Sequence, residues 1–218
     1  MGLFMRPLHT AKNTLSYRVV KRVFDMAIST LGVVAFSPLF VLTGLLILIS
    51  MGPPVILSQR RDGRGGRIIY VYKFKTRRNP VDIMGRPLSL RERSTRVGRA
   101  LRARRLDELP QLFNVMKGDM AIVGPRPLPP VDQPAKPSLR LAVAPGLTGW
   151  AQIQGGKLVS IDEKNALDEW YVRNACLRLD AEIIWRVLKG DRRDVDQLSA
   201  ALASTAKDRN EGDQSATA

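Results

Sequence analysis

Hydrophobic residues are concentrated near the amino terminus, where residues 26–59 contain no charged side chain. The apolar part of this stretch, MAISTLGVVAFSPLFVLTGLLILISM, is long enough to enter a lipid bilayer as a helix. Ser37 and Pro38 lie near its middle, where proline removes a backbone donor and clashes with the preceding turn. The pattern therefore predicts a helix over residues 17–51 that is interrupted at Ser37-Pro38 and stopped by the Gly-Pro-Pro that follows.

Basic sequence flanks this stretch on both sides. Five Lys or Arg residues precede the first acid, Asp25, and residues 60–78 hold eight against a single Asp. Since basic flanks stay on the cytoplasmic side of a membrane, a straight spanning helix satisfies that rule at one end only. A helix that returns to the same face satisfies it at both ends. We therefore predict a re-entrant membrane helix over residues 17–54, bent at Pro38, with both chain termini in the cytoplasm.

Alternating residues after the apolar stretch predict a β-hairpin, with an extended segment, a turn over residues 62–66 and a returning strand, RIIYVYKF. Residues 91–106 predict a basic amphipathic helix with Val97, Ala100 and Leu101 on its apolar side. Such a helix either lies in a membrane interface or packs its narrow apolar stripe on a core, and the sequence leaves both interpretations open.

Two adjacent acids begin the next predicted helix. Asp107 is placed as its N-cap, Pro110 is tolerated in the first turn, and Gly118 closes it. A glycine-rich loop over residues 145–156 has the composition of a tightly built binding loop, and a final helical region follows over residues 165–189.

These elements predict a mixed α/β, membrane-associated fold: a re-entrant helix, interfacial amphipathic helices and a small cytoplasmic α/β core. The length allows one domain beside the membrane segment. The predicted divisions are an N-terminal extension (1–16), the re-entrant helix (17–54), the cytoplasmic catalytic domain (55–190) and a polar tail without fixed structure (191–218).

The positive charge is gathered in one part of the chain. The formal net charge is +15, and residues 60–105 hold 16 Lys or Arg against 3 acids. A patch of this kind binds anionic lipid headgroups, a phosphate-rich substrate or a nucleic acid. The long uncharged run and the lack of a recognisable nucleic-acid module argue against a nucleic-acid-binding protein. A membrane scaffold without catalysis is the other alternative.

Cysteine and histidine are too scarce for several kinds of site. Cys176 is the single cysteine, which excludes an intramolecular disulfide, and His9 is the single histidine. Multi-histidine metal sites are therefore excluded and a Ser-His-Asp hydrolase is disfavoured. A bound metal is expected to be a hard ion, Mg²⁺ or Mn²⁺, held by carboxylates and phosphate.

Asp107 and Glu108 are the leading catalytic candidates. Adjacent acids at a helix start have an ordinary role, because they cap free backbone N–H groups. This pair, however, directly follows the basic sequence around Arg102, in a region where acids are scarce. The VGPRP segment follows, and its Arg126 is placed to clamp an anion.

The sequence LDELPQLFNVMKGDMAIVGPRP resembles the signature of the monotopic phosphoglycosyl transferases, bacterial sugar transferases that start glycan assembly on a lipid carrier. The resemblance extends to KRVFD (21–25), the Ser37-Pro38 break, YKFKT (72–76), PGLTGWAQ (145–152) and DEWYVRN with the LD that follows. It covers roughly residues 17–190, and the chain is similar to the minimal form of the family. The family has a re-entrant helix broken at Ser-Pro.

The resemblance implies a two-step transfer. The carboxylate that matches Asp107 attacks the β-phosphate of a nucleotide diphosphate sugar, usually a UDP-sugar, and expels UMP. Polyprenol phosphate, such as undecaprenyl phosphate, then takes the sugar phosphate from the aspartate. Glu108 matches the acidic partner, so the resemblance implies Mg²⁺ held by Glu108 and Asp107. It also implies the cytoplasmic face of the bacterial inner membrane, no nucleic acid, and leaves open a homodimer.

Further site residues follow from the same resemblance. Arg102 and Arg126 match positions that bind phosphate or order the site, and Lys73 and Thr76 are weaker candidates near the donor. The chain departs from the family at Lys75, where arginine is usual. It departs again at Arg77, where methionine is usual. After PGLTGWAQ the family commonly has a Gly-Arg pair, whereas this chain has IQGGK, in which Lys157 is the nearest cation. These departures bear on donor specificity.

Overall fold

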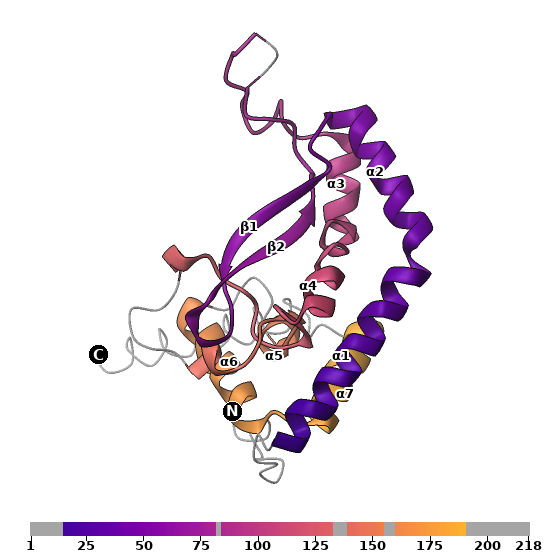
Figure 1. The fold of residues 1–218 in the computed structure, drawn as a ribbon. Coiled ribbons are helices and arrows are strands. Elements are labelled where there is room, and N and C mark those ends of the chain that lie inside the picture. Colours follow the sequence, from indigo (N-terminus) through magenta and orange to yellow (C-terminus); the bar gives the residue numbers. More distant parts are fainter. Residues whose placement is uncertain (1–14, 82–83, 133–138, 155–159, 191–218) are drawn as a thin grey trace, which may run out of the picture.

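A computed structural model describes residues 15–81, 84–132, 139–154 and 160–190. Two long helices form a bent arch along one side of the molecule, and a small α/β body lies against it (Figure 1). The arch consists of α1 (Leu15–Ala35) and α2 (Ser37–Met51), which meet at an angle of 60°. The mixed α/β character predicted from the sequence is confirmed.

The bend lies at the predicted break. Phe36 separates the two helices, and Pro38 has no N–H to donate to the carbonyl of Val34 one turn earlier. The hydroxyl of Ser37 donates to that carbonyl instead, at 2.8 Å. Among the described residues no single helix combines the length and apolar composition that a membrane crossing needs, and only the bent pair meets both criteria. Re-entry into a membrane stays a prediction.

Polar contacts attach α1 to the body. Asp25 accepts a hydrogen bond from the backbone N–H of Ile122 at 3.0 Å, and Lys21 donates to Asp180 at 2.9 Å. Arg22 donates to the carbonyls of Val115 and Met116 at 2.6 and 2.7 Å. Those carbonyls lie at the end of α4 (Gln111–Lys117), where the helix leaves acceptors unpaired.

Apolar contacts attach α2. Ile47 and Met51 pack with Phe74 and Leu101 in a small buried cluster. On its other side α2 exposes a row of large apolar side chains: Val41, Leu42, Leu45, Leu48 and Ile49. At the end of the helix the buried ammonium of Lys75 donates to the carbonyls of residues 51, 52 and 53 at 2.9–3.1 Å.

The predicted hairpin is confirmed as β1 (Ile56–Asp62) and β2 (Ile68–Phe74), which pair antiparallel around the turn η1 (Arg64–Gly66). The predicted helix over residues 91–106 is wrong at both ends, since α3 spans only Arg96–Ala103. Thr95 is its N-cap and accepts from the N–H of Gly98 at 2.9 Å. Val97 and Leu101 pack on the apolar cluster, but Ala100 is exposed.

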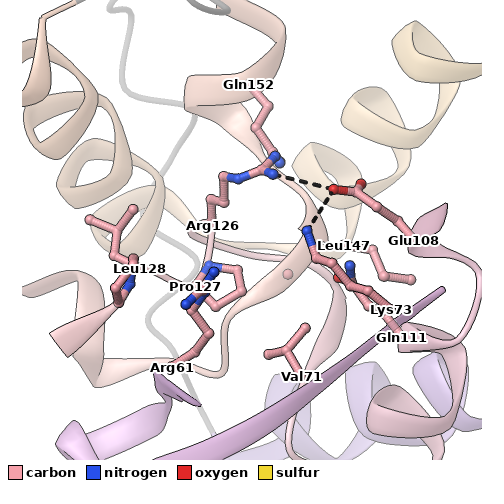
Figure 2. A pocket seen from close by; sticks show the side chains of 12 residues that line it. Arg61, Val71, Lys73, Glu108, Gln111, Arg126, Pro127, Leu128, Leu147 and Gln152 are labelled. Atoms are coloured by element: carbon pink, nitrogen blue, oxygen red, sulfur yellow. Dashed lines mark hydrogen bonds and ion pairs between the residues drawn. The ribbon is translucent and has the colours of Figure 1, made fainter. Parts of the chain in front are cut away.

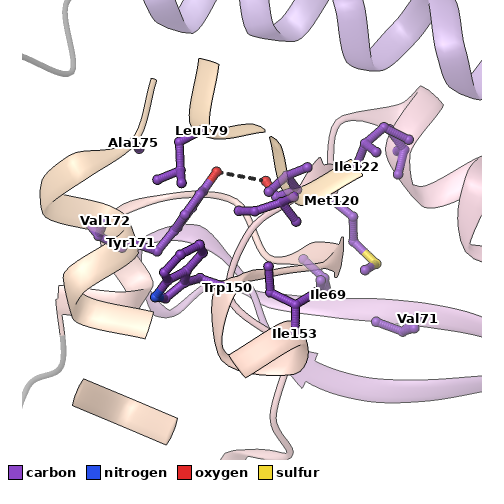
Figure 3. Packing of buried hydrophobic residues seen from close by; sticks show 13 residues of the cluster. Ile69, Val71, Met120, Ile122, Trp150, Ile153, Tyr171, Val172, Ala175 and Leu179 are labelled. Carbon is purple, nitrogen blue, oxygen red and sulfur yellow. Dashed lines mark hydrogen bonds between the residues drawn. The ribbon is translucent and has the colours of Figure 1, made fainter. Parts of the chain in front are cut away.

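The main core joins β2, through Ile69 and Val71, to elements of the second half of the chain. Parallel strands β3 (Ala121–Val123) and β4 (Gly146–Thr148) pack against α5 (Trp150–Gln154), α6 (Ile161–Asn174) and α7 (Leu177–Leu188), as Figure 3 shows in part. The predicted final helical region is thus two helices. It begins earlier than expected, because Ser160 and Glu163 form a reciprocal capping box.

Short 3₁₀ helices complete the described elements: η2 (Leu106–Glu108), η3 (Pro130–Asp132) and η4 (Leu139–Ala142). The predicted tail (191–218) and most of the predicted N-terminal extension (1–14) lie outside the described residues. Where the chain is described, β2 contacts both η2 and α4, and α3, η2 and α4 lie between the hairpin and the arch (Figure 1).

Candidate active site

Asp107 and Glu108 lie on the tight turn η2 rather than at the start of a long helix. The preceding residue, Arg105, adopts a left-handed backbone with φ 56° and ψ 21°, the one positive φ among the described non-glycine residues. A side chain in that region carries strain, which the surrounding structure must hold in place. This left-handed residue separates α3 from η2, which carries both acids.

The predicted N-cap role of Asp107 is wrong. The helix α4 starts at Gln111, its N-cap is Pro110, and neither η2 nor α4 has a side-chain cap. The physical reason is that Leu106–Glu108 forms its own 3₁₀ turn, which separates the acids from the first turn of α4. Helix capping therefore does not explain why the two acids lie at this position.

Two cations hold Glu108. The Nζ atom of Lys73, on β2, lies 3.3 Å from its Oε1, and the Nη2 atom of Arg126, after β3, lies 3.2 Å from the same oxygen. Figure 2 shows the two side chains approaching the carboxylate from different elements. Three residues far apart in the sequence are thereby brought together, as the predicted site requires.

Arg102 and Thr76 form a second contact beside the pair. The Nη1 atom of Arg102 donates to both the carbonyl and the hydroxyl of Thr76, each at 3.0 Å. The helix that carries Arg102 approaches closely, because a Cβ at Gly98 would lie 2.0 Å from the carbonyl oxygen of Thr76. Glycine is therefore required there, and the guanidinium is held in one position.

The carboxyl group of Asp107 is half-buried, and that burial raises its pKa above the ordinary aspartate value. The negative charge of Glu108 raises the pKa further, while Lys73 and Arg102 oppose the rise. A carboxylate with a raised pKa is a stronger base and nucleophile when ionised.

A cavity of about 280 Å³ opens beside these residues. Lys73, Glu108 and Arg126 line it, whereas Asp107 is not part of the lining. Figure 2 shows most of the wall, whose apolar members include Val71, Pro127, Leu128 and Leu147 and whose other polar members include Arg61, Gln111 and Gln152. The cavity thus combines a charged end with apolar surface.

Asn114 positions the site, and the sequence analysis missed it. This fully buried residue of α4 accepts from the N–H of Tyr72 at 2.9 Å and donates to the carbonyl of Tyr70 at 2.7 Å. It bonds to β2 as a neighbouring strand would, and so fixes the strand that carries Lys73 against the helix that follows Glu108. A polar residue on the otherwise apolar side of a helix was the available signal.

The backbone of Arg126 is also held in place by a hydrogen bond. Its carbonyl accepts from the Nη2 atom of Arg140 at 2.7 Å, and the same nitrogen lies 3.0 Å from Asp168. Both members of this ion pair are buried. Burial raises the pKa of Asp168 to about 6 although Arg140 opposes the rise. Sequence reasoning singled out neither residue, because η4 and α6 are distant along the chain.

The remaining predicted residues lie elsewhere. Lys157 is outside the described residues, and Ser37 and Pro38 form the bend of the arch. Lys75 caps the end of α2 and does not line the cavity, so its departure from the family bears on helix attachment.

The described residues contain no group of three or more His, Cys, Asp or Glu side chains that could hold a metal ion. Asp107 and Glu108 are adjacent carboxylates, which are the hard oxygen donors that Mg²⁺ prefers. An ion that binds through one or two carboxylates, with phosphate and water as the other ligands, fits this donor set.

Comparison with known proteins identifies related sequences. The sequence model of the family described as Bacterial sugar transferase matches residues 16–190. The chain is 39% identical over 169 residues to EpsL of Bacillus subtilis, described as an uncharacterized sugar transferase, with 76% of this chain and 84% of that protein covered.

Two relatives have names that state a reaction. The chain is 36% identical over 184 residues to the UDP-N-acetylgalactosamine-undecaprenyl-phosphate N-acetylgalactosaminephosphotransferase of Aeromonas hydrophila, covering 79% of this chain and 44% of the relative. It is 38% identical over 186 residues to the undecaprenyl-phosphate glucose phosphotransferase of Komagataeibacter xylinus, covering 78% and 35%. The chain therefore spans less than half the length of these two relatives.

Proposed function

Because the chain belongs to the bacterial sugar transferase family, we propose that it transfers a sugar 1-phosphate from a UDP-sugar to polyprenol phosphate, with release of UMP. The names of the relatives support undecaprenyl phosphate as the acceptor class and a sugar nucleotide as the donor. The observation that carries the proposal is the Asp107-Glu108 pair on a strained turn, with Lys73, Arg102 and Arg126 around it.

In the first step a carboxylate oxygen of Asp107 forms a bond to the β-phosphorus of the donor. The bond from that phosphorus to the bridging oxygen breaks, and UMP leaves with the electron pair. In the second step an oxygen of polyprenol phosphate attacks the same phosphorus and frees Asp107. The product is polyprenol diphosphate sugar. A covalent intermediate allows a soluble donor and a lipid acceptor to use one site in turn.

The cations around the pair have a defined part in both steps. Lys73 and Arg126 contact Glu108 and line the cavity, so they are placed to offset the charge of a diphosphate. Burial and Glu108 raise the pKa of Asp107, and Arg102 opposes that rise, so Arg102 favours the ionised nucleophile. Mg²⁺, which Glu108 and Asp107 would hold together with the substrate, would supply further neutralisation of phosphate charge.

The same proposal places the arch in the cytoplasmic leaflet of the bacterial inner membrane. Its support is the 60° bend, the exposed apolar side chains of α2 and the basic sequence on both sides of the pair. The body then faces the cytoplasm, where the nucleotide sugar is soluble. Tags at both termini are expected to be accessible from the cytoplasm only, and a periplasmic amino terminus contradicts this placement.

The reaction is tested by trapping the intermediate. Detergent-purified protein is incubated with Mg²⁺ and a panel of UDP-sugars without acceptor, and intact mass and released UMP are measured. An added sugar phosphate in the parent protein, absent from Asp107→Asn, is expected. Asn is nearly isosteric with Asp but is not a nucleophile here. The assignment is contradicted if the Asn variant also releases UMP and forms the adduct. It is equally contradicted if neither protein does so.

The pH dependence of trapping gives a second test. Because the pKa of Asp107 is raised, the rate of adduct formation rises with pH as this carboxyl ionises. Arg102→Gln removes a positive charge that opposes this rise in pKa, so the rising limb is expected to move to higher pH. A limb that stays in place contradicts the assignment of the limb to Asp107.

A further inference from the structure

The amide end of the half-buried Gln152 side chain is shielded in the cavity wall and has no partner among the described residues. Its Nε2 and Oε1 atoms are both shielded from solvent, and neither has a hydrogen-bond partner among the described residues. Leaving one buried polar group unpaired is costly, and here a donor and an acceptor on the same side chain are unpaired together. Figure 2 shows the side chain extending from its helix toward the part of the cavity where Arg126 and Glu108 meet.

The backbone that carries Gln152 is fixed. Its N–H donates to the carbonyl of Gly149 at 3.1 Å, and a Cβ at Gly149 would lie only 2.2 Å from the carbonyl oxygen of Gly124. Trp150, in the same turn, stacks on Trp170 with ring centroids 4.8 Å apart. The carboxamide is therefore presented by a rigid element next to the segment that carries Arg126, and local rearrangement does not easily provide it with partners.

The cavity wall indicates what pairs with it. Pro127, Leu128 and Leu147 give apolar surface that suits a flat ring, and the charged members of the wall, such as Lys73 and Arg126, suit the phosphates. Along one edge, a carboxamide offers an N–H donor beside an acceptor oxygen. The imide edge of uracil offers the complement, a ring N–H beside a carbonyl.

We propose that Gln152 recognises the uracil base of the donor. Its Oε1 accepts from the N3–H of uracil, its Nε2 donates to the adjacent carbonyl O4, and the apolar wall packs on the ring. The proposal rests on the proposed function for the donor class and adds a specificity residue to it. The base then lies between the apolar wall and Arg126, with the phosphates directed toward the cations Arg126 and Lys73.

The test compares two ligands that differ only in the base. Binding of UMP and of ribose 5-phosphate to the full-length, detergent-purified protein is measured by calorimetry with Mg²⁺ present. Gln152→Leu keeps the bulk of the side chain and removes both hydrogen bonds, and its Kd for UMP is expected to rise about 10- to 100-fold. Its Kd for ribose 5-phosphate is expected to stay within about twofold of the parent value.

Two further variants provide controls. Gln152→Glu replaces the donor with a carboxylate that repels O4, so it is also expected to lose UMP selectively. Gln154→Leu is the matched control, because the Nε2 atom of Gln154 is also buried and unpaired but its side chain does not line the cavity. Its affinities for both ligands are expected to match those of the parent.

Several results overturn the inference. The inference is wrong if Gln152→Leu binds UMP as tightly as the parent protein. If that variant also has a raised KM for the donor, the amide contacts the sugar instead. Equal weakening of both ligands in both Gln152 variants indicates a structural role. A parent protein that forms the sugar-phosphate adduct but holds UMP no better than ribose 5-phosphate overturns base recognition and leaves the proposed function intact. Absence of both adduct and UMP binding contradicts both.

Discussion

The two helices of the arch contact the body through different kinds of group. On α1 charged and hydrogen-bonded contacts, from Lys21, Arg22 and Asp25 to backbone groups and Asp180, accompany the apolar packing of Tyr17 and Ile28. On α2 they are mainly apolar, centred on Ile47 and Met51. Hydrogen bonds fix rotation and height along a helix, whereas apolar contacts fix mainly the distance between surfaces.

The difference matters most if α2 lies in lipid, as proposed. Apolar side chains are then in contact with hydrocarbon whether or not they pack on the body. Packing them on the body therefore removes no apolar surface from water, and the hydrophobic effect does not contribute to its free energy. Three hydrogen bonds from Lys75 at the end of α2 become the directional contact of that helix. The α1 side needs no such addition, because polar groups already determine its position.

Removing Asp25 is expected to have the largest effect on the polar side. Asp25→Ala leaves the N–H of Ile122 unpaired in a buried place and removes an acid near Lys21, and we expect a loss of about 3 kcal/mol in the free energy of unfolding. Chemical unfolding in detergent measures it. Asp119→Ala is the control, since the cations paired with Asp119 are exposed, and it should cost about 1 kcal/mol or less. Equal losses in the two variants contradict the ranking.

Ile47→Ala tests the apolar side. Ile47 is fully buried, and its truncation is expected to cost about 2–3 kcal/mol, at the low end for core substitutions because lipid or detergent replaces part of the lost contact. The matched control is Ile49→Ala on the same helix, where the side chain is 84% exposed and a change of about 0.5 kcal/mol or less is expected. A large effect at Ile49 would indicate that the exposed side of α2 is covered by protein.

Lys75→Met separates the ammonium from its stem. Met retains the length and packing of the side chain but cannot donate to the three carbonyls at the end of α2, so a loss of about 1–2 kcal/mol is expected. Unfolding in lipid nanodiscs and in detergent should show the larger loss in nanodiscs, where the apolar contacts contribute least. Lys117→Met, at an exposed lysine, should be nearly neutral in both.

Pro38→Ala is expected to change stability by about 1 kcal/mol or less and to act on shape instead. With an N–H at position 38 the carbonyl of Val34 regains its helical partner, and the 60° bend should decrease. Spin labels at the exposed positions Val23 and Ile49, in a Cys176→Ser background, would then separate by up to about 5 Å. Ser37→Ala, which keeps the proline, should leave the distance unchanged. An unchanged distance in both would show that the attachments of the two helices impose the bend.

Local patterns predicted the elements whose cause is local. The helix break at Pro38, the hairpin and the end of α4 at Gly118 follow from residues within a few positions, and all three are confirmed. The proximity of Asp107-Glu108 to basic residues could also be inferred, since Arg102 lies within two turns of the pair.

Long-range contacts account for what was missed. Whether Asp107 caps a helix depends on the left-handed Arg105, and no neighbouring residue predicts that conformation. Asn114, Lys75 and Arg140 look ordinary in the sequence, and their importance comes from partners that folding brings close. A polar residue among apolar neighbours in the sequence signals a buried hydrogen bond, but it does not identify the residue that forms the other half of that bond.

The glycines behind the cavity have a consequence for the donors that variants of this protein can accept. A Cβ at Gly124, Gly146 or Gly149 would lie within 2.5 Å of a backbone atom, so the chain crossing there admits no side chain. Directed evolution at these three positions would return misfolded protein. Libraries aimed at a new donor are better placed at Leu128 and Leu147, whose side chains line the cavity and are only partly buried.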